Sequence, residues 1–234
     1  MEQGKADRID LGIILQARMG SSRLPGKILK KIGNKTLLDH IIFRLGFLKH
    51  QAIIVLATTC SPKDDEVERY CKSKNIYCFR GNEENVLERY YCCAKEYGFK
   101  NIVRLTADNP FIDIEELDNL IELYYQNGLD YASSYRSLPV GVGAEIFTFD
   151  ALEKSYLNGK AAHHLEHVDE YILENIDQFH TDTLKISGDK NRPDIRLTVD
   201  TEANYKVACY IVKNAPGEYI TTQDAIRLIS DFSE

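Results

Sequence analysis

The alternation of short apolar segments with amphipathic segments most constrains the fold of this chain. The apolar segments have the length of buried strands and lie at residues 11–15, 52–57, 76–79 and 102–105. The intervening segments carry apolar side chains at helical spacing and lie at residues 37–45, 64–74, 86–97 and 114–126. This order predicts right-handed βαβ units around a mostly parallel sheet, in an α/β, Rossmann-like fold of three layers.

The pattern is less regular after residue 130. We predict strands at residues 131–135, 145–149, 180–186 and 195–199, and helices at 151–157, 164–175 and 203–213. These strands are expected to form a small antiparallel extension of the sheet. No linker, repeat or low-complexity tract is visible, so we expect one domain over residues 1–234, with 1–10 as a polar tail.

Charge is distributed unevenly along the chain. The formal net charge is −7, which argues against a general nucleic-acid-binding protein. Residues 11–38 nevertheless contain no acidic side chain, and six basic ones: Arg18, Arg23, Lys27, Lys30, Lys31 and Lys35. A compact cationic segment on an acidic protein indicates a site for one small polyanion.

Compartment and membrane contact are predicted from absent signals. No apolar run approaches the roughly 20 residues that span a bilayer, and the N-terminus lacks the pattern of a signal peptide. The six cysteines show no CxxC spacing, which favours reduced thiols over a metal or disulfide framework. We therefore expect a cytoplasmic protein without membrane contact.

The segment 15–27 follows the first predicted strand and has the composition of a phosphate-binding loop. Small residues allow backbone N–H groups to face a ligand, and they are Gly20, Ser21 and Ser22. Side-chain cations can bind phosphate oxygens, and they are Arg18, Arg23 and Lys27. At the open edge of an α/β sheet this set suits a triphosphate, although the Walker pattern is absent. The alternative is a basic surface loop.

Two aspartates also follow predicted strands. A carboxylate at Asp108 could hold Mg²⁺ against the triphosphate, because Mg²⁺ prefers oxygen ligands. Asp108 could instead be a turn residue before Pro110. Asp200 taken alone is as well explained as a helix N-cap.

A pair of histidines invites a different metal. His163 and His167 are four residues apart on a predicted helix, a spacing that can bind zinc. No cysteine or further histidine follows at fixed spacing, so a solvated helix start is the simpler interpretation.

Five blocks of the sequence together resemble the SpsF-like cytidylyltransferases, the type named for spore coat polysaccharide biosynthesis. Their relatives are the acylneuraminate and ketodeoxyoctonate cytidylyltransferases. The blocks are residues 15–27, 83–91, 103–113, 166–168 and 196–201, and the resemblance runs from Ile13 to about Val212.

The resemblance implies a nucleotidylyltransferase fold and the transfer of CMP from CTP to a small anionic acceptor, with release of pyrophosphate. The acceptor would be an acidic sugar or a phosphonate or phosphate, for the synthesis of surface polysaccharide or glycoconjugate precursors. Mg²⁺ is the implied cofactor, with Asp108 and Asp200 as its ligands. Relatives are often dimers, so a homodimer is expected.

The resemblance also assigns roles to residues. The catalytic set is Arg18, Lys27 and Asp108. The nucleotide-binding set is Gln16, Ala17, Arg18, Gly20, Ser21, Ser22, Arg23, Lys27, Arg104 and Asp108, with cytosine contacted largely by backbone groups near residues 16–18. The acceptor-binding set is Glu145, Glu166 and His167.

Three positions depart from the family pattern, which has aspartate where this chain has Asn85, Gly143 and Asn204. The phosphate-binding and metal positions are kept, so the departures bear on acceptor identity and local hydrogen bonding.

Three other functions remain possible. A metal-dependent glycosyltransferase would carry a short DxD motif after a strand, and a non-catalytic nucleotide-binding module would have lost Lys27, Asp108 or Asp200. The chain fits neither description. A nucleotidylyltransferase that uses UTP or GTP is not separated from one that uses CTP.

Overall fold

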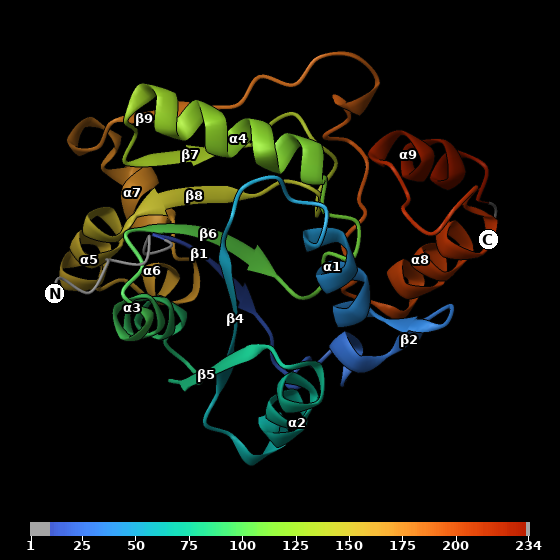
Figure 1. Cartoon of the computed structure of the whole chain (residues 1–234), viewed down its shortest axis with the longest axis horizontal. Helices are drawn as coiled ribbons and strands as arrows, with labels where there is room; N and C mark the ends of the chain where they lie inside the picture. Colours follow the sequence, from blue (N-terminus) through green and yellow to red (C-terminus); the bar gives the residue numbers. More distant parts are fainter. Residues whose placement is uncertain (1–9, 233–234) are drawn as a thin grey trace, which may run out of the picture.

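The computed structural model describes residues 10–232 and is built on a seven-stranded sheet (Figure 1). The strand order is β5-β4-β1-β6-β8-β7-β9. The strands are β1 (Leu11–Gln16), β4 (Ile53–Thr59), β5 (Tyr77–Gly81), β6 (Asn101–Thr106), β7 (Tyr131–Ser133), β8 (Glu145–Thr148) and β9 (Thr181–Thr183). Strand β8 runs antiparallel to its neighbours β6 and β7, and the other pairings are parallel. The predicted mostly parallel sheet is confirmed.

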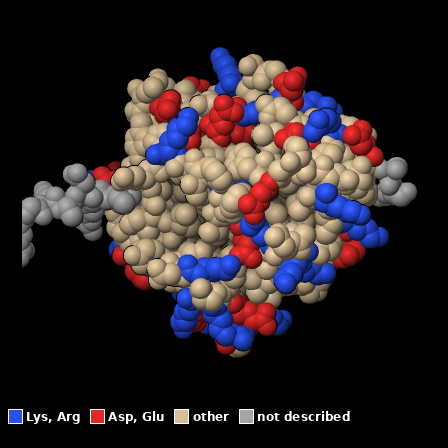
Figure 2. Space-filling view, turned by 45° about the vertical axis from the view of Figure 1, so that its right-hand side comes forward, with Lys and Arg blue, Asp and Glu red and all other residues tan. Residues whose placement is uncertain are grey.

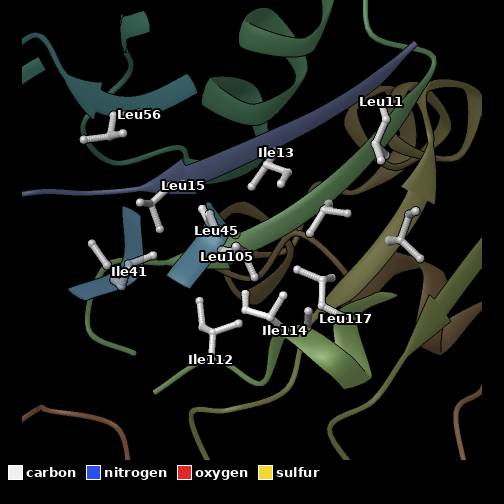
Figure 3. Close-up of a cluster of buried hydrophobic side chains, with 14 of the residues drawn as sticks. Leu11, Ile13, Leu15, Ile41, Leu45, Leu56, Leu105, Ile112, Ile114 and Leu117 are labelled. Atoms are coloured by element: carbon white, nitrogen blue, oxygen red, sulfur yellow. The ribbon is translucent and has the colours of Figure 1, made fainter. Parts of the chain in front are cut away.

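Helices cover both faces of the sheet. One face packs against α1 (Leu37–Leu45), α2 (Asp65–Lys74) and α4 (Ile114–Asn127), in the apolar cluster drawn in Figure 3. The other face packs against α3 (Val86–Tyr97), α5 (Phe149–Asn158) and α7 (Glu170–Glu174). Three layers result because the parallel strands present apolar side chains to both sides, as the sequence predicted.

A third apolar cluster lies beside the sheet, where α8 (Glu202–Asn214) and α9 (Thr222–Ser230) pack near a two-stranded hairpin (Figure 1). The hairpin joins β2 (Lys31–Ile32) to β3 (Lys35–Thr36) and turns at Gly33, whose φ is +65°. The remaining helices are α6 (Ala162–Glu166) and the short 3-10 helices η1 (Lys27–Leu29), η2 (Pro62–Asp64), η3 (Ile176–Gln178) and η4 (Gly188–Lys190). The hairpin and α9 were not predicted.

Several helix ends follow local rules. Thr36 forms a capping box with Asp39 at the start of α1, as the sequence predicted for Thr36. Helices α3 and α4 end at Gly98 and Gly128, which both adopt positive φ.

The largest differences from the predicted elements lie in the second half. The predicted helix 164–175 is two helices, α6 and α7, separated by residues 167–169, because Val168 turns into the apolar cluster under α5 and is 1% exposed. The predicted strand 195–199 is extended but lies outside the sheets. Its backbone hydrogen bonds go to Val140 and Asp108, so it forms one isolated bridge and no ladder.

Charged side chains are mixed on the face drawn in Figure 2, where lysines and arginines alternate with aspartates and glutamates around a broad uncharged area. This arrangement offers a long polyanion no continuous basic surface on that face. Within residues 10–232, no helix is both long and apolar enough to cross a membrane. All six cysteines are free thiols.

Candidate functional site

A cavity of about 360 Å³ opens at the carboxyl edge of β1 and β6. The two strands pair in parallel, with Gln16 opposite Thr106, so the segments that follow them leave the sheet side by side. The cavity is lined by most of the residues that the sequence singled out: Gln16, Arg18, Gly20, Ser21, Ser22, Arg23, Lys27, Arg104, Asp108, Glu166, His167 and Asp200. The site therefore combines residues from distant parts of the chain.

Two residues of the predicted set do not line the cavity. Ala17 is 1% exposed, and its N–H donates to the carbonyl of Ala57. The carbonyl of Gln16 accepts from the N–H of Ala107. The Ala17 N–H and the Gln16 carbonyl, two of the backbone groups expected to contact cytosine, therefore already have partners in the protein. Glu145 is 0% exposed and lies behind the cavity wall.

The cationic loop after β1 is held by hydrogen bonds within the protein. The Met19 carbonyl accepts from the N–H groups of Ser21 and Gly26, and the Met19 N–H donates to the buried carboxylate of Asp64 at 2.7 Å. Gly26 has a φ of +66°, which lets the chain turn directly into η1 with Lys27 at its start. Asp64 thus positions the loop, a role that the sequence did not indicate.

Lys27 joins the loop to both aspartates. Its Nζ lies 3.0 Å from Asp108 Oδ2 and 2.9 Å from Asp200 Oδ1. The side chain of Lys27 is 10% exposed, so this contact is largely removed from solvent. The two carboxylates therefore approach one another closely across a single ammonium group.

Backbone contacts bring the two aspartates together. The N–H of Val199 donates to the carbonyl of Asp108 at 2.8 Å, which places residue 200 beside residue 108. Gly141 allows the close packing of this segment, because a Cβ there would lie 2.7 Å from the backbone nitrogen of Thr198 and its φ is +98°. The N-cap of α8 is Thr201, so the carboxylate of Asp200 is left to face the cavity.

Neighbouring hydroxyl and cationic groups orient these carboxylates. The Thr106 hydroxyl donates to Asp108 Oδ1 at 2.6 Å and accepts from the side-chain amide of Asn109 at 2.8 Å. Asp200 lies 3.5 Å from Arg23 Nη2 and 3.4 Å from Arg196 Nη1. No role was predicted for Thr106 or Arg196, although both lie in blocks that resemble the family. A role for Thr106 could have been predicted, because residues two apart in a strand share a face, so Thr106 points to the same side of β6 as Arg104.

These carboxylates fit the magnesium ion that the family resemblance implies. Oxygens of Asp108 and Asp200 both lie within 3.0 Å of one nitrogen, so they could share one small cation. Mg²⁺ usually takes one or two carboxylates, with phosphates and water as its other ligands.

Arg104 forms the inner wall of the cavity and is fixed by a buried polar cluster. Its Nη1 pairs with Glu145 and lies 3.8 Å from Asp169 Oδ1. The hydroxyls of Tyr131 and Tyr135 donate to the Glu145 carboxylate at 3.0 and 3.4 Å. Burial raises the pKa of Glu145 to about 7, with the charge of Asp169 as a second cause, although Arg104 and Tyr131 partly offset both.

The outer wall carries Glu166 and His167. Arg18 Nη2 lies 3.8 Å from Glu166 Oε1, and both side chains are more than 40% exposed. Such a pair is screened by solvent and adds little stability, so both groups remain available to a ligand.

The histidines do not form the pair considered for zinc. His163 and His164 each contact one oxygen of Glu174 at 2.7 Å, whereas His167 lies at the end of α6 and lines the cavity.

The three departures from the family pattern have local explanations. Asn85 caps α3, and its side chain accepts from the Glu88 N–H at 2.9 Å. Asn204 completes the capping box of α8 by accepting from the Thr201 N–H. At Gly143 a Cβ would lie 2.8 Å from the ring of Tyr135, so Tyr135 fills the space that a side chain there would need.

Comparison with known proteins shows which family this chain is similar to. Residues 12–223 match the cytidylyltransferase family. The chain is 34% identical to the spore coat polysaccharide biosynthesis protein SpsF of Bacillus subtilis, over 84% of each protein. A solved cytidylyltransferase structure from Leptospira borgpetersenii is 33% identical, covers 95% of this chain and 94% of its own, and superposes with a TM-score of 0.87. A CMP:2-keto-3-deoxy-manno-octonic acid synthetase complexed with CTP shares the fold, with a TM-score of 0.67 and 18% identity over 87% of this chain and 98% of its own.

Proposed function

Because the chain belongs to the cytidylyltransferase family, we propose that it transfers CMP from CTP to a small anionic acceptor and releases pyrophosphate. The observation that carries this proposal is the convergence of the cationic loop and two carboxylates at Lys27. The triphosphate of a nucleotide bound in this cavity would lie beside cations that can pair with its phosphates and carboxylates that can hold a metal ion.

The loop residues would bind the triphosphate. Arg23 and Lys27 can neutralise charge on the leaving pyrophosphate, and Arg18 adds a third cation at the cavity wall. Asp108 and Asp200 would hold Mg²⁺, which when bound neutralises phosphate charge and can lower the pKa of the attacking group. Phosphoryl transfer depends mainly on such positioning and electrostatics, so the site needs no covalent nucleophile.

The acceptor would lie toward Arg104, Glu166 and His167. Arg104 can bind a carboxylate, phosphonate or phosphate in a bidentate manner. Glu166 and His167 supply exposed hydrogen-bonding groups in the cavity lining for sugar hydroxyls. An acidic sugar therefore suits this half of the cavity, in keeping with a place in surface polysaccharide or glycoconjugate precursor synthesis.

A pyrophosphate-release assay tests the proposal. The purified chain is incubated with Mg²⁺, with each of four NTPs in turn, and with a panel of acidic sugars, phosphonates and sugar phosphates. We expect release that requires CTP, Mg²⁺ and one acceptor class together. Release with UTP or GTP but not with CTP would contradict the cytidine assignment. If no combination of nucleotide and acceptor releases pyrophosphate, the transfer activity itself is contradicted.

A further inference from the structure

The carboxylates assigned to the metal already hold a cation of the chain itself. Lys27 Nζ lies 3.0 Å from Asp108 and 2.9 Å from Asp200, at the position between them that a shared ion would take. The Lys27 side chain is 10% exposed and those of Asp108 and Asp200 are 27% and 20% exposed, so water screens this contact only partly. A divalent ion cannot enter between the carboxylates while the ammonium group stays there.

Two of the three cations beside the carboxylates, Lys27 and Arg23, also line the cavity that would take the nucleotide, whereas Arg196, 3.4 Å from Asp200, does not line it. Arg23 lies 3.5 Å from Asp200, and both Arg23 and Lys27 line the cavity and belong to the phosphate-binding loop. Each of these side chains therefore has two competing kinds of partner, the carboxylates of the protein and the phosphates of the ligand. Lysine has a long, flexible stem, so its ammonium group can move between them without a change in the backbone.

We propose that Lys27 is an internal competitor of the metal, which keeps the Asp108–Asp200 pair closed to Mg²⁺ until a triphosphate draws the ammonium group away. A divalent ion beside an ammonium group is repelled, and the repulsion is strong where water is partly excluded. When the phosphates take Lys27 and Arg23 as partners, Asp108 Oδ2 and Asp200 Oδ1 become free to bind the ion, while Thr106 and Arg196 keep the other oxygen of each carboxylate. Metal and nucleotide binding are then coupled through one side chain. This inference rests on the proposed function only for the use of Asp108 and Asp200 as metal ligands.

Mn²⁺ binding in the absence of nucleotide tests the inference directly. Free Mn²⁺ is followed by its electron paramagnetic resonance signal during titration of the protein. Lys27→Met removes the charge and keeps an unbranched side chain, and we expect it to bind Mn²⁺ at least tenfold more tightly than wild type. Lys27→Arg keeps the charge and should bind as weakly as wild type.

Lys30→Met is the matched control. It makes the same change in net charge a few residues away, where Lys30 is 38% exposed and lies 3.9 Å from Glu202. We expect it to change Mn²⁺ affinity less than twofold. Adding Asp108→Asn to Lys27→Met should abolish the gain, which locates the bound ion. Lys27→Gln replaces Lys27→Met if circular dichroism shows that the methionine variant does not fold.

The inference is overturned if Lys27→Met binds Mn²⁺ no more tightly than wild type, if Lys30→Met gains as much, or if the gain survives Asp108→Asn. Each of these results leaves the transfer assay unaffected. Failure of the proposed function is seen separately, as the absence of pyrophosphate release from every NTP.

Discussion

Arg104 faces the cavity and is paired behind it with Glu145, a carboxylate that has no exposed surface. Glu145 therefore cannot contact a bound acceptor in this arrangement, although the family resemblance assigns it to acceptor binding. Its carboxylate instead pairs with the Arg104 guanidinium and accepts from the Tyr131 hydroxyl, and Arg104 also lies 3.8 Å from Asp169. We therefore propose that Glu145 is a positioning residue and that Arg104 is the group that contacts the acceptor.

The buried carboxyl of Glu145 should make stability depend on pH. Its pKa rises from 4.5 to about 7 on folding, so between these values the folded protein holds a proton that the unfolded chain releases. Stability should then fall as pH rises from about 4.5 to 7, and this contribution should level off above pH 7. Glu145→Gln removes this titratable carboxyl. Between pH 4.5 and 7 the free energy of unfolding of the variant should therefore fall less steeply with pH than that of wild type, by up to about 1.4 kcal/mol per pH unit.

Urea denaturation of both proteins at pH 5, 6, 7 and 8 measures these slopes. Glu122→Gln is the matched control, because Glu122 is exposed on α4, and its slope should follow wild type. Parallel lines for wild type and Glu145→Gln would show that Glu145 releases its proton at the same pH in the folded and unfolded chain.

The carboxylate of Asp108, the proposed metal ligand, should be essential for turnover and dispensable for folding. Asp108→Asn keeps the shape of the side chain and weakens its hold on a divalent ion, so we expect pyrophosphate release to fall at least about a hundredfold. The melting temperature should stay within a few degrees of wild type. Asp182→Asn, an exposed change on β9 outside the cavity lining, should keep full activity. Wild-type turnover by Asp108→Asn would refute the metal assignment.

Much of the fold follows from the sequence because the central strands form continuous apolar runs. Strands β1, β4 and β6 are buried on both faces, and their helices end at capping residues that are visible in the sequence, such as Gly98. The second half was predicted less well because distant contacts decide it. No proline or glycine marks the break between α6 and α7, which depends on the burial of Val168 and the contacts of Glu174.

The same distinction applies to the site. Lys27, Asp108 and Asp200 each follow a strand or an extended segment, so the sequence could predict that they meet at one edge. The cluster behind Arg104 could not be predicted. Tyr131 and Tyr135 lie in and just after β7, whereas Asp169 lies between α6 and α7, and no shared motif joins these segments to Glu145 on β8. Their proximity depends on the order of β6, β8 and β7 in the sheet.

A buried tyrosine ties the two strands that lead into the site. The hydroxyl of Tyr90 is within hydrogen-bonding distance of the carbonyl oxygens of Ile14 and Leu105, at 3.2 and 3.1 Å, and the residue is 0% exposed. Tyr90→Phe should lower the free energy of unfolding by about 1 kcal/mol, because this hydrogen bond is lost without a change in shape. Urea denaturation measures the change. Tyr77→Phe, 60% exposed, should stay within about 0.5 kcal/mol of wild type, and an equal loss there would contradict the argument.

Gly143 and Tyr135 should be energetically coupled, because they compete for the space beside Glu145. A Cβ at Gly143 would lie 2.8 Å from Tyr135 Cδ1 and 3.2 Å from Ser134 Oγ, so Gly143→Ala forces the ring to move and weakens the hydroxyl contact with Glu145. We expect a loss of about 1–3 kcal/mol in the free energy of unfolding.

In a Tyr135→Ser background the ring is absent and the same substitution should cost less than about 0.5 kcal/mol, which a double-mutant cycle of urea denaturation measures. Purely additive losses would show that the ring does not limit position 143. If the coupling is found, a chain with aspartate at position 143 must have a smaller residue at 135. The pair would then decide whether a ring or a carboxylate lies beside Arg104, and so which acceptors reach that guanidinium.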